Sequence, residues 1–155
     1  MIDTIVDIDG TVADCSHRLW HIEKKSKRFD NFHDIMENDE PIWTIIRLVM
    51  AIRLSGGRII YCTGRPNSHR QMTIDWLNRY NIGFNHLSAG VPFAHGLYMR
   101  ASNDYRPDIV VKRELYDMII RDGFEPELVL EDRTRCVEMW RSLGLKTLQV
   151  EKADY

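Results

Sequence analysis

The sequence predicts an α/β fold in which a mostly parallel central sheet carries helices on both faces. Two observations support this prediction. Short apolar segments rich in β-branched residues alternate with segments of helical period, and acidic or hydroxyl residues follow the predicted strand ends. Hydrophobic residues make up 44% of the chain and charged residues 28%, as in ordinary folded proteins. The length of 155 residues suits one compact domain, so we expect residues 1–155 to form a single domain.

Apolar strands and amphipathic helices alternate in the first third of the chain. Residues 2–8 are apolar and β-branched, which predicts a buried strand. Residues 16–38 mix charged and aromatic side chains and predict one or two short helices. Another helix begins at Pro41, continues with apolar residues at helical spacing, and ends at Gly56 and Gly57.

The middle of the chain continues this alternation and then loses it. The segment RIIYC at residues 58–62 predicts the second strand, and a helix of about residues 68–80 follows it. Residues 84–105 are the least regular part, with a short strand expected around residues 97–99. The expected inner face of the helix consists of Met72, Trp76, Leu77 and Tyr80.

The last third predicts two more helices and two more strands. Pro107 suits the first turn of a helix that Gly123 ends. A strand at residues 127–130, a helix at residues 134–143 and a final strand at residues 146–150 follow. This order favours parallel strand pairing. The expected core side of the first of these helices consists of Val111, Leu115, Met118 and Ile119, and Trp43, Trp76 and Trp140 also fall on predicted core faces.

Composition and charge exclude several classes of protein. A net charge of -2 and a pI near 6.3 give no overall attraction to nucleic acid or anionic membranes, so any nucleic-acid contact needs a local patch. The first residues lack the order of a signal peptide, and no apolar run could span a bilayer. Three cysteines without a CxxC pair are typical of reduced thiols. We therefore expect a cytoplasmic protein without a membrane partner.

The segment IVDIDGTVAD at residues 5–14 is the strongest motif. Asp7 and Asp9 leave the first predicted strand one residue apart, where buried carboxylates indicate a bound cation or substrate. Gly10 allows a sharp turn, and Thr11 can bond back to it. The alternative is an ordinary structural Asp-Gly turn, which is common in proteins.

Other polar residues are predicted to reach the same edge of the sheet. Thr63 follows the second strand, Glu131 and Asp132 follow the fourth, and Lys112 lies near the start of a helix. Reactive residues of parallel sheets collect beyond the carboxyl ends of the strands. Each residue also has a structural alternative, because strand-end threonines are usually turn residues, helix lysines are usually solvated, and adjacent acids can cap a helix.

Taken together and in this order, VDIDGT, IIYCTGR, DIVVKRE and LVLEDRT resemble the motifs of haloacid dehalogenase (HAD) phosphatases. The resemblance implies an HAD-like Rossmannoid three-layer sandwich with a minimal cap, in which residues 16–40 and 84–105 are small insertions near the site. It also implies a Mg²⁺-dependent phosphomonoester hydrolase. The presence of Asp9 disfavours dehalogenase chemistry, and the small insertions disfavour a mutase.

The resemblance also assigns roles to individual residues. Asp7 would be the nucleophile that forms an aspartyl-phosphate, and Asp9 the general acid/base. Burial and nearby carboxylates are expected to keep Asp9 protonated near neutral pH. Thr63 and Lys112 would bind the phosphoryl oxygens. The oxygen ligands expected for Mg²⁺ are those of Asp7, Asp9, Asp132 and Glu131.

The stretches DIVVKRELYDMI and LEDRTRCVEMWRSLGLKTLQVEKADY resemble, more narrowly, the 3′-phosphatase domain of bacteriophage polynucleotide kinase/phosphatase. This match implies that Arg18 and Arg65 contact phosphate or the substrate strand, with Thr11 as a further substrate contact. Asp108 would support Lys112, four residues later on the same helix face. Glu131 departs from that family's usual aspartate. No G-x-x-x-x-G-K-[ST] loop occurs, so we expect no kinase domain in these residues.

The sequence leaves more than one substrate open. The segment HIEKKSKRF at residues 21–29 carries four cations and could follow a phosphate backbone or form a solvated helix face. The favoured substrate is the 3′-phosphate of a polynucleotide end, and the alternative is the 5′-phosphate of free (deoxy)nucleoside monophosphates. A third possibility, an inactive HAD-fold binding module, is disfavoured because Asp7, Asp9 and Lys112 are all present.

Overall fold

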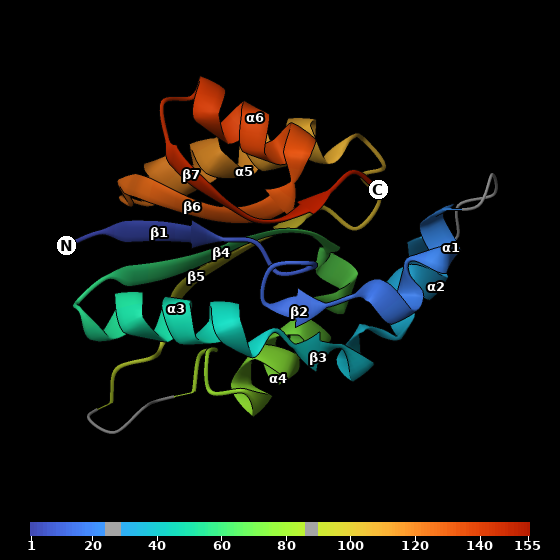
Figure 1. Ribbon diagram of the computed structural model, residues 1–155, viewed down its shortest axis with the longest axis horizontal. Coiled ribbons are helices and arrows are strands. Elements are labelled where there is room, and N and C mark those ends of the chain that lie inside the picture. Colours follow the sequence, from blue (N-terminus) through green and yellow to red (C-terminus); the bar gives the residue numbers. More distant parts are fainter. Residues whose placement is uncertain (24–28, 86–89) are drawn as a thin grey trace.

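A computed structural model describes residues 1–23, 29–85 and 90–155 of the chain. Its centre is a five-stranded sheet of order β5-β4-β1-β6-β7, in which every neighbouring pair is parallel (Figure 1). This confirms the predicted parallel sheet. Its strands are β1 (Asp3–Val6), β4 (Arg58–Pro66), β5 (Ala94–Arg100), β6 (Pro126–Arg133) and β7 (Lys146–Ala153).

Two helices cover each face of this sheet, as the three-layer prediction requires. On one face lie α3 (Trp43–Leu54) and α4 (Arg70–Arg79), and on the other lie α5 (Asp108–Arg121) and α6 (Thr134–Ser142) (Figure 1). Each interface has its own buried cluster, in which Trp76 lies on the first face and Trp140 on the second. Both indole side chains are fully buried, as predicted.

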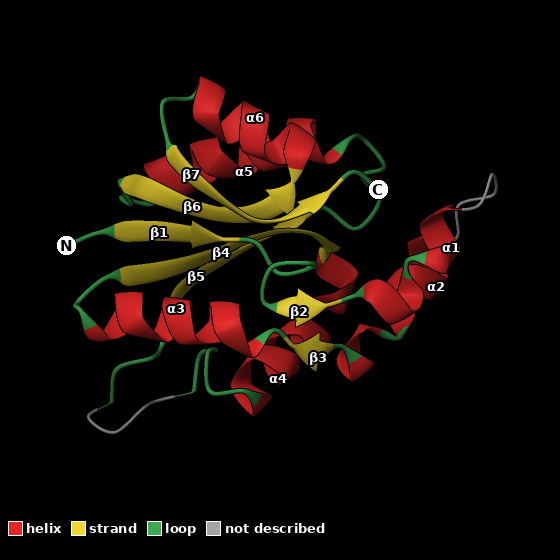
Figure 2. Cartoon of the chain, in the orientation of Figure 1, coloured by secondary structure: helices red, strands yellow, loops and turns green. Residues whose placement is uncertain are grey.

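Most of the remaining described elements lie beyond the carboxyl end of β1 (Figure 2). A small antiparallel pair, β2 (Ala13–Asp14) and β3 (Glu40–Pro41), leads into them. The expected one or two short helices are four short helical segments in the described residues. They are η1 (Ser16–Arg18), α1 (Trp20–Glu23), α2 (Phe29–Asp34) and η2 (Met36–Asn38), and a further turn, η3 (Asn67–His69), precedes α4.

Several element boundaries differ from the prediction. Pro41 belongs to β3, so α3 begins only at Trp43, and β4 continues to Pro66, four residues beyond the apolar segment that predicted it. The irregular region contains a longer strand than expected, and this strand, β5, is one edge of the central sheet. Apolar spacing therefore located the elements well but placed their ends poorly.

Two predicted core positions are wrong, and a third is only partly buried. Met118 is 43% exposed, because the buried face of α5 consists of Val111, Lys112, Leu115 and Ile119. Trp43 is 48% exposed at the first turn of α3, where its ring packs edge-on against Tyr80. On α4, Thr73 is buried, whereas Met72 lies at the margin of the buried face.

Two further expectations can be compared with the structure. All three cysteines are buried and free, as predicted for reduced thiols. Across the described part of the chain, no helix has both the length and the apolar character needed to cross a membrane.

Candidate active site

The carboxyl edge of the central sheet brings the predicted residues together, as expected. Asp7 directly follows β1, Thr63 lies in β4, and Glu131 and Asp132 lie near the end of β6. Lys112 reaches the same edge from the first turns of α5 and is fully buried. The sheet topology therefore explains why residues more than 100 positions apart in sequence can meet, as in the Asp7–Lys112 pair.

A tight turn positions the first motif. The backbone amides of Thr11, Val12 and Ala13 all donate to the carbonyl of Ile8, at 3.2, 3.0 and 2.9 Å. Gly10 adopts a φ of +83°, and a Cβ atom there would overlap the Asp132 carboxylate. Glycine is therefore required at this position both by conformation and by contact.

Lys112 connects two buried carboxylates at the centre of the site. Its Nζ donates to Asp7 Oδ1 at 2.8 Å and to Glu131 Oε2 at 2.7 Å. The indole Nε1 of Trp140 donates to the same Glu131 oxygen at 3.2 Å. With Asp132 alongside, three buried carboxylates face one lysine, which leaves a formal charge of -2 if all four groups are ionised.

This excess of negative charge changes the acidity of the carboxyl groups. Burial and the Glu131 carboxylate raise the pKa of Asp7 well above its usual range, although Lys112 opposes the shift. Burial and Glu131 also raise the pKa of Asp132, to about 7. A positive charge added between these groups would stabilise their ionised forms.

The residues present fit a divalent cation. Asp7, Glu131 and Asp132 offer carboxylate oxygens within 4.8 Å of one another, and all three are buried. Asp132 Oδ1 has no hydrogen-bond partner among the described residues, although the atom is buried. A buried carboxylate oxygen needs such a partner, and oxygen ligands of this kind suit Mg²⁺.

Asp9 belongs to a second charged network on the other side of the turn. Its Oδ1 accepts from Arg18 Nη2 at 2.5 Å and from Arg65 Nη2 at 2.6 Å. The carboxylate of Asp39 binds the same two guanidinium groups, at 2.6 Å from Arg18 Nη2 and 3.0 Å from Arg65 Nη2. Two arginines and two aspartates thus balance each other in formal charge.

This network contradicts the expected protonation of Asp9. Burial by itself would raise the pKa of Asp9, but Arg18 and Arg65 together hold that pKa well below its usual range. The prediction that burial and nearby carboxylates keep Asp9 protonated near neutral pH is therefore wrong for this arrangement. The adjacent guanidinium groups stabilise the carboxylate instead.

The positions of the expected substrate contacts also need correction. The side chains of Arg18 and Arg65 are 0% exposed and bind Asp9 and Asp39, so neither lies open to a substrate strand. Thr11 is buried too, and its Oγ1 donates to Asp7 Oδ2 at 3.4 Å, which makes it a neighbour of the expected nucleophile. In each case a nearby carboxylate takes the hydrogen bond that substrate was expected to take.

Asp108 does not form the expected pair with Lys112. Its two carboxylate oxygens bind Arg100 and Arg133, while Lys112 is held by Asp7 and Glu131. The helical spacing is as predicted, but the Lys112 side chain extends into the site. The Asp108 carboxylate is instead bound by Arg100 from β5 and Arg133 from β6. Asp108 also limits Gly64, because a Cβ atom there would lie 2.9 Å from Asp108 Oδ1.

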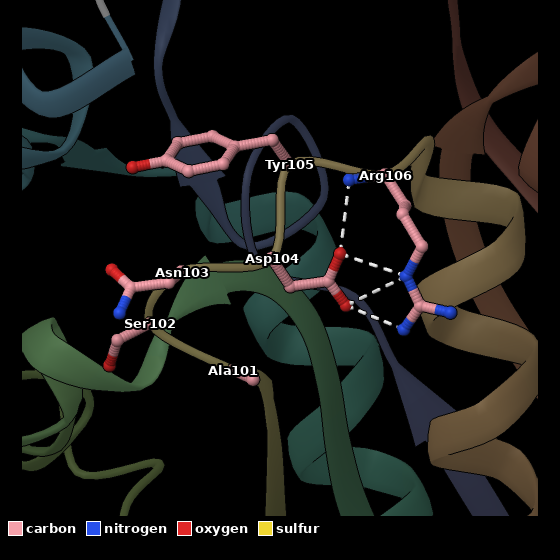
Figure 3. Close-up of a pocket in the computed structure, with 6 residues that line it drawn as sticks. All are labelled: Ala101, Ser102, Asn103, Asp104, Tyr105 and Arg106. Carbon is pink, nitrogen blue, oxygen red and sulfur yellow. Dashed lines mark hydrogen bonds and ion pairs between the residues drawn. The ribbon is translucent and has the colours of Figure 1, made fainter.

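A shallow hollow follows β5 and contains none of the predicted chemistry. Residues 101–106 line it, and in Figure 3 the Asp104 carboxylate faces the guanidinium group of Arg106 while the Tyr105 ring points away. Arg100 holds the second half of this loop by donating to the carbonyls of Asp104 and Arg106, at 2.9 and 2.7 Å. The hollow is a feature of the loop and lacks the buried carboxylates described above.

Sequence reasoning missed important residues of both networks. Asp39 is buried and binds Arg18 and Arg65, yet it lies in the polar run ENDEP with no motif or period around it. Tyr155, near the end of the chain, donates to Asp132 Oδ2 at 2.9 Å.

Thr63 is located as predicted, and its Oγ1 accepts from the amide of Arg65 at 3.2 Å. The cationic residues 24–28 lie outside the described part of the chain.

A family comparison and a sequence relative both point to polynucleotide kinase proteins. Residues 3–155 match the family described as the polynucleotide kinase PNKP phosphatase domain. The chain is 28% identical over 152 residues to a protein of Autographa californica nuclear polyhedrosis virus that is named for polynucleotide kinase and RNA ligase. That match covers 97% of this chain and 19% of the viral protein.

Solved structures agree with this fold. A chain of the Pnkp1/Rnl/Hen1 RNA repair complex superposes with a TM-score of 0.80 at 27% identity, over 100% of this chain and 44% of that one. This chain therefore spans less than half the length of the viral and repair-complex relatives. A class C acid phosphatase from Bacillus anthracis has a TM-score of 0.64 at 15% identity, over 99% of this chain and 68% of that one, which shows a shared fold.

Proposed function

Because this chain belongs to the family of polynucleotide kinase phosphatase domains and is thus an HAD-type phosphatase, we propose that it removes 3′-phosphates from polynucleotide ends. The reaction would use bound Mg²⁺ and an aspartyl-phosphate intermediate on Asp7. The observation that carries the chemical part is the buried set of Asp7, Glu131 and Asp132 around Lys112. Such a set is costly to bury unless it binds charged groups.

The proposed metal site follows from charge and from one unpartnered atom. Asp7, Asp132, Glu131 and the backbone carbonyl of Asp9 would hold Mg²⁺. When bound, the ion would offset the local charge of -2 and reduce the repulsion between a phosphate dianion and the Asp7 carboxylate. The Glu131 Oε2 atom already accepts from Lys112 and Trp140, so Asp132 Oδ1 is the better candidate for a direct ligand.

The protein side chains would divide the steps of the reaction between them. Asp7 attacks phosphorus, and the bond from phosphorus to the ribose oxygen breaks with its electron pair on that oxygen. Lys112, already beside Asp7, stabilises charge on the phosphoryl oxygens, and Thr63 binds them from β4. Water then attacks the aspartyl-phosphate and releases inorganic phosphate.

Asp9 would serve both proton transfers, but its surroundings set a condition. As a carboxylate beside two guanidinium groups, it is suited to accept a proton from the attacking water. Donation to the leaving oxygen requires a higher pKa at Asp9. The negative charge of an incoming phosphate beside Asp9 would raise this pKa, because it favours the protonated form of the carboxyl group.

A second candidate is a phosphatase of free nucleoside monophosphates. The net charge of -2 favours it, because a polymer-binding surface usually carries an evident excess of positive charge. Membership of a polynucleotide kinase phosphatase family and the relative from an RNA repair complex support the polynucleotide end.

Phosphate release separates these candidates. A 3′-phosphorylated oligonucleotide is compared with 3′- and 5′-mononucleotides, in Mg²⁺ and in EDTA, with Asp7→Asn as the inactive control. We expect Mg²⁺-dependent release that is fastest from the oligonucleotide and slows as salt rises. Release confined to mononucleotides would assign the enzyme to free nucleotides, and equal release in EDTA would contradict the metal site.

A further inference from the structure

Tyr155 reaches the proposed metal site from the far end of the sequence. It follows β7, and the C-terminus lies on the side of the central sheet where the parallel strands end (Figure 1). The phenol hydroxyl donates to Asp132 Oδ2 at 2.9 Å and lies 3.5 Å from the backbone carbonyl oxygen of Asp9. Its oxygen is therefore close to two of the groups proposed to hold Mg²⁺.

The Tyr155 ring is held in place by its own contacts. The guanidinium carbon of Arg133 lies 4.5 Å from the ring centroid, which is cation–π geometry. The ring also packs against the small buried cluster of Cys15, Ile22 and Phe32. The hydroxyl oxygen also lies 3.5 Å from Cys15 Sγ. The contact with Arg133 involves the ring alone, so it should persist when the hydroxyl is removed.

The hydrogen bond from Tyr155 leaves the two oxygens of Asp132 with different roles. Oδ2 accepts from the phenol and also lies against Gly10. Oδ1 is buried without a hydrogen-bond partner in the described structure, and one carboxylate oxygen of Asp132 lies within 4.8 Å of oxygens of Asp7 and Glu131. A carboxylate whose orientation is fixed by one oxygen presents the other in a constant direction, which favours metal binding.

We propose that Tyr155 is a positioning residue for the metal site, because its hydroxyl binds Asp132 Oδ2 and so directs Oδ1 toward Mg²⁺. This inference rests on the proposed metal-dependent function, and it adds a residue to which the sequence motifs give no role. Outer hydrogen bonds of this kind typically change metal affinity about 10- to 100-fold.

Direct Mg²⁺ binding to Tyr155→Phe tests this role. The substitution removes the hydroxyl and keeps the ring, so the contacts with Arg133 should remain. Tyr98→Phe is the matched control, since Tyr98 also donates its hydroxyl to an aspartate, Asp122 Oδ2, at 2.6 Å, but away from the site. Calorimetric titration with Mg²⁺ gives the affinity, and thermal unfolding in EDTA checks that each variant folds.

The expected result is a Kd for Mg²⁺ that rises about 10- to 100-fold in Tyr155→Phe and stays at the wild-type value in Tyr98→Phe. Saturating Mg²⁺ should then restore most of the turnover of Tyr155→Phe. A folded Tyr155→Phe protein with wild-type affinity would overturn the role of Tyr155 while the metal site stands. Failure of the wild-type protein to bind Mg²⁺ would overturn the metal site, and the role of Tyr155 with it.

Discussion

Replacing Asp39 by asparagine tests whether the two-arginine network is a structural requirement. Asp39 is 1% exposed, and its carboxylate accepts from Arg18 Nε at 2.7 Å, from Arg18 Nη2 at 2.6 Å and from Arg65 Nη2 at 3.0 Å. Among residues 1–23, 29–85 and 90–155, the carboxylates that form ion pairs with these two guanidinium groups are those of Asp39 and Asp9. The asparagine keeps the shape of the side chain and removes one of the two negative charges.

The expected loss of stability follows from that imbalance. With Asp39 neutral, two buried cations face one carboxylate, and one formal positive charge is left uncompensated. Removing one partner of a buried ion pair typically costs about 3–5 kcal/mol. For a chain of this length, that loss corresponds to a fall in Tm of roughly 6–20 °C.

Urea unfolding of wild type and Asp39→Asn measures this loss. Asp117→Asn is the control, because Asp117 forms an exposed ion pair with Arg113 on the surface of α5. We expect the control to change the free energy of unfolding by less than about 0.5 kcal/mol. An equal, small change in both variants would show that the Arg18–Arg65 network does not depend on the charge of Asp39.

Two other variants address the turn and the pH dependence. Gly10→Ala should lose about 1–3 kcal/mol of stability because its φ is positive, and it should lose activity because the new Cβ displaces the Asp132 carboxylate. Gly56 has a φ of +94° and no atom near the position of a Cβ. Gly56→Ala should therefore be destabilised but remain active in phosphate-release assays. Burial and nearby guanidinium groups lower the pKa of His33 from 6.5 to about 4. As pH falls from about 6.5 to about 4, His33 is protonated in the unfolded chain before it is protonated in the folded one. The free energy of unfolding should therefore fall by up to about 3 kcal/mol over this range. Urea titrations of His33→Asn should lack this contribution to the pH dependence.

The fold could be predicted because hydrophobic period and topology act together. The buried strands and the inner faces of the helices are largely apolar, which located four strands of the central sheet well and the edge strand β5 only in part. The parallel order then placed Asp7, Thr63 and Asp132 at one edge. The failures occurred at positions such as Met118 and Trp43, where burial depends on how a helix is rotated against the sheet.

The electrostatics of the site could not be predicted, because they depend on residues without a sequence signal. Asp39 lies 21 positions from Arg18, and no period or motif connects them. Arg18 and Arg65 were expected to contact substrate, whereas in the fold they bind Asp9 and lower its pKa, so the sequence suggested the wrong protonation state. Tyr155 was missed for the same reason, since only the folded chain brings it to Asp132.

Trapping of the covalent intermediate tests the central claim most directly. The enzyme is mixed with Mg²⁺ and p-nitrophenyl phosphate, whose leaving group needs no proton, then quenched in acid and analysed by peptide mass spectrometry. We predict one phosphoryl group on Asp7 in the wild type and more of it in Asp9→Asn, because that variant lacks the base for the water step. A phosphoryl group on another residue, or undiminished hydrolysis by Asp7→Asn, would contradict Asp7 as the nucleophile.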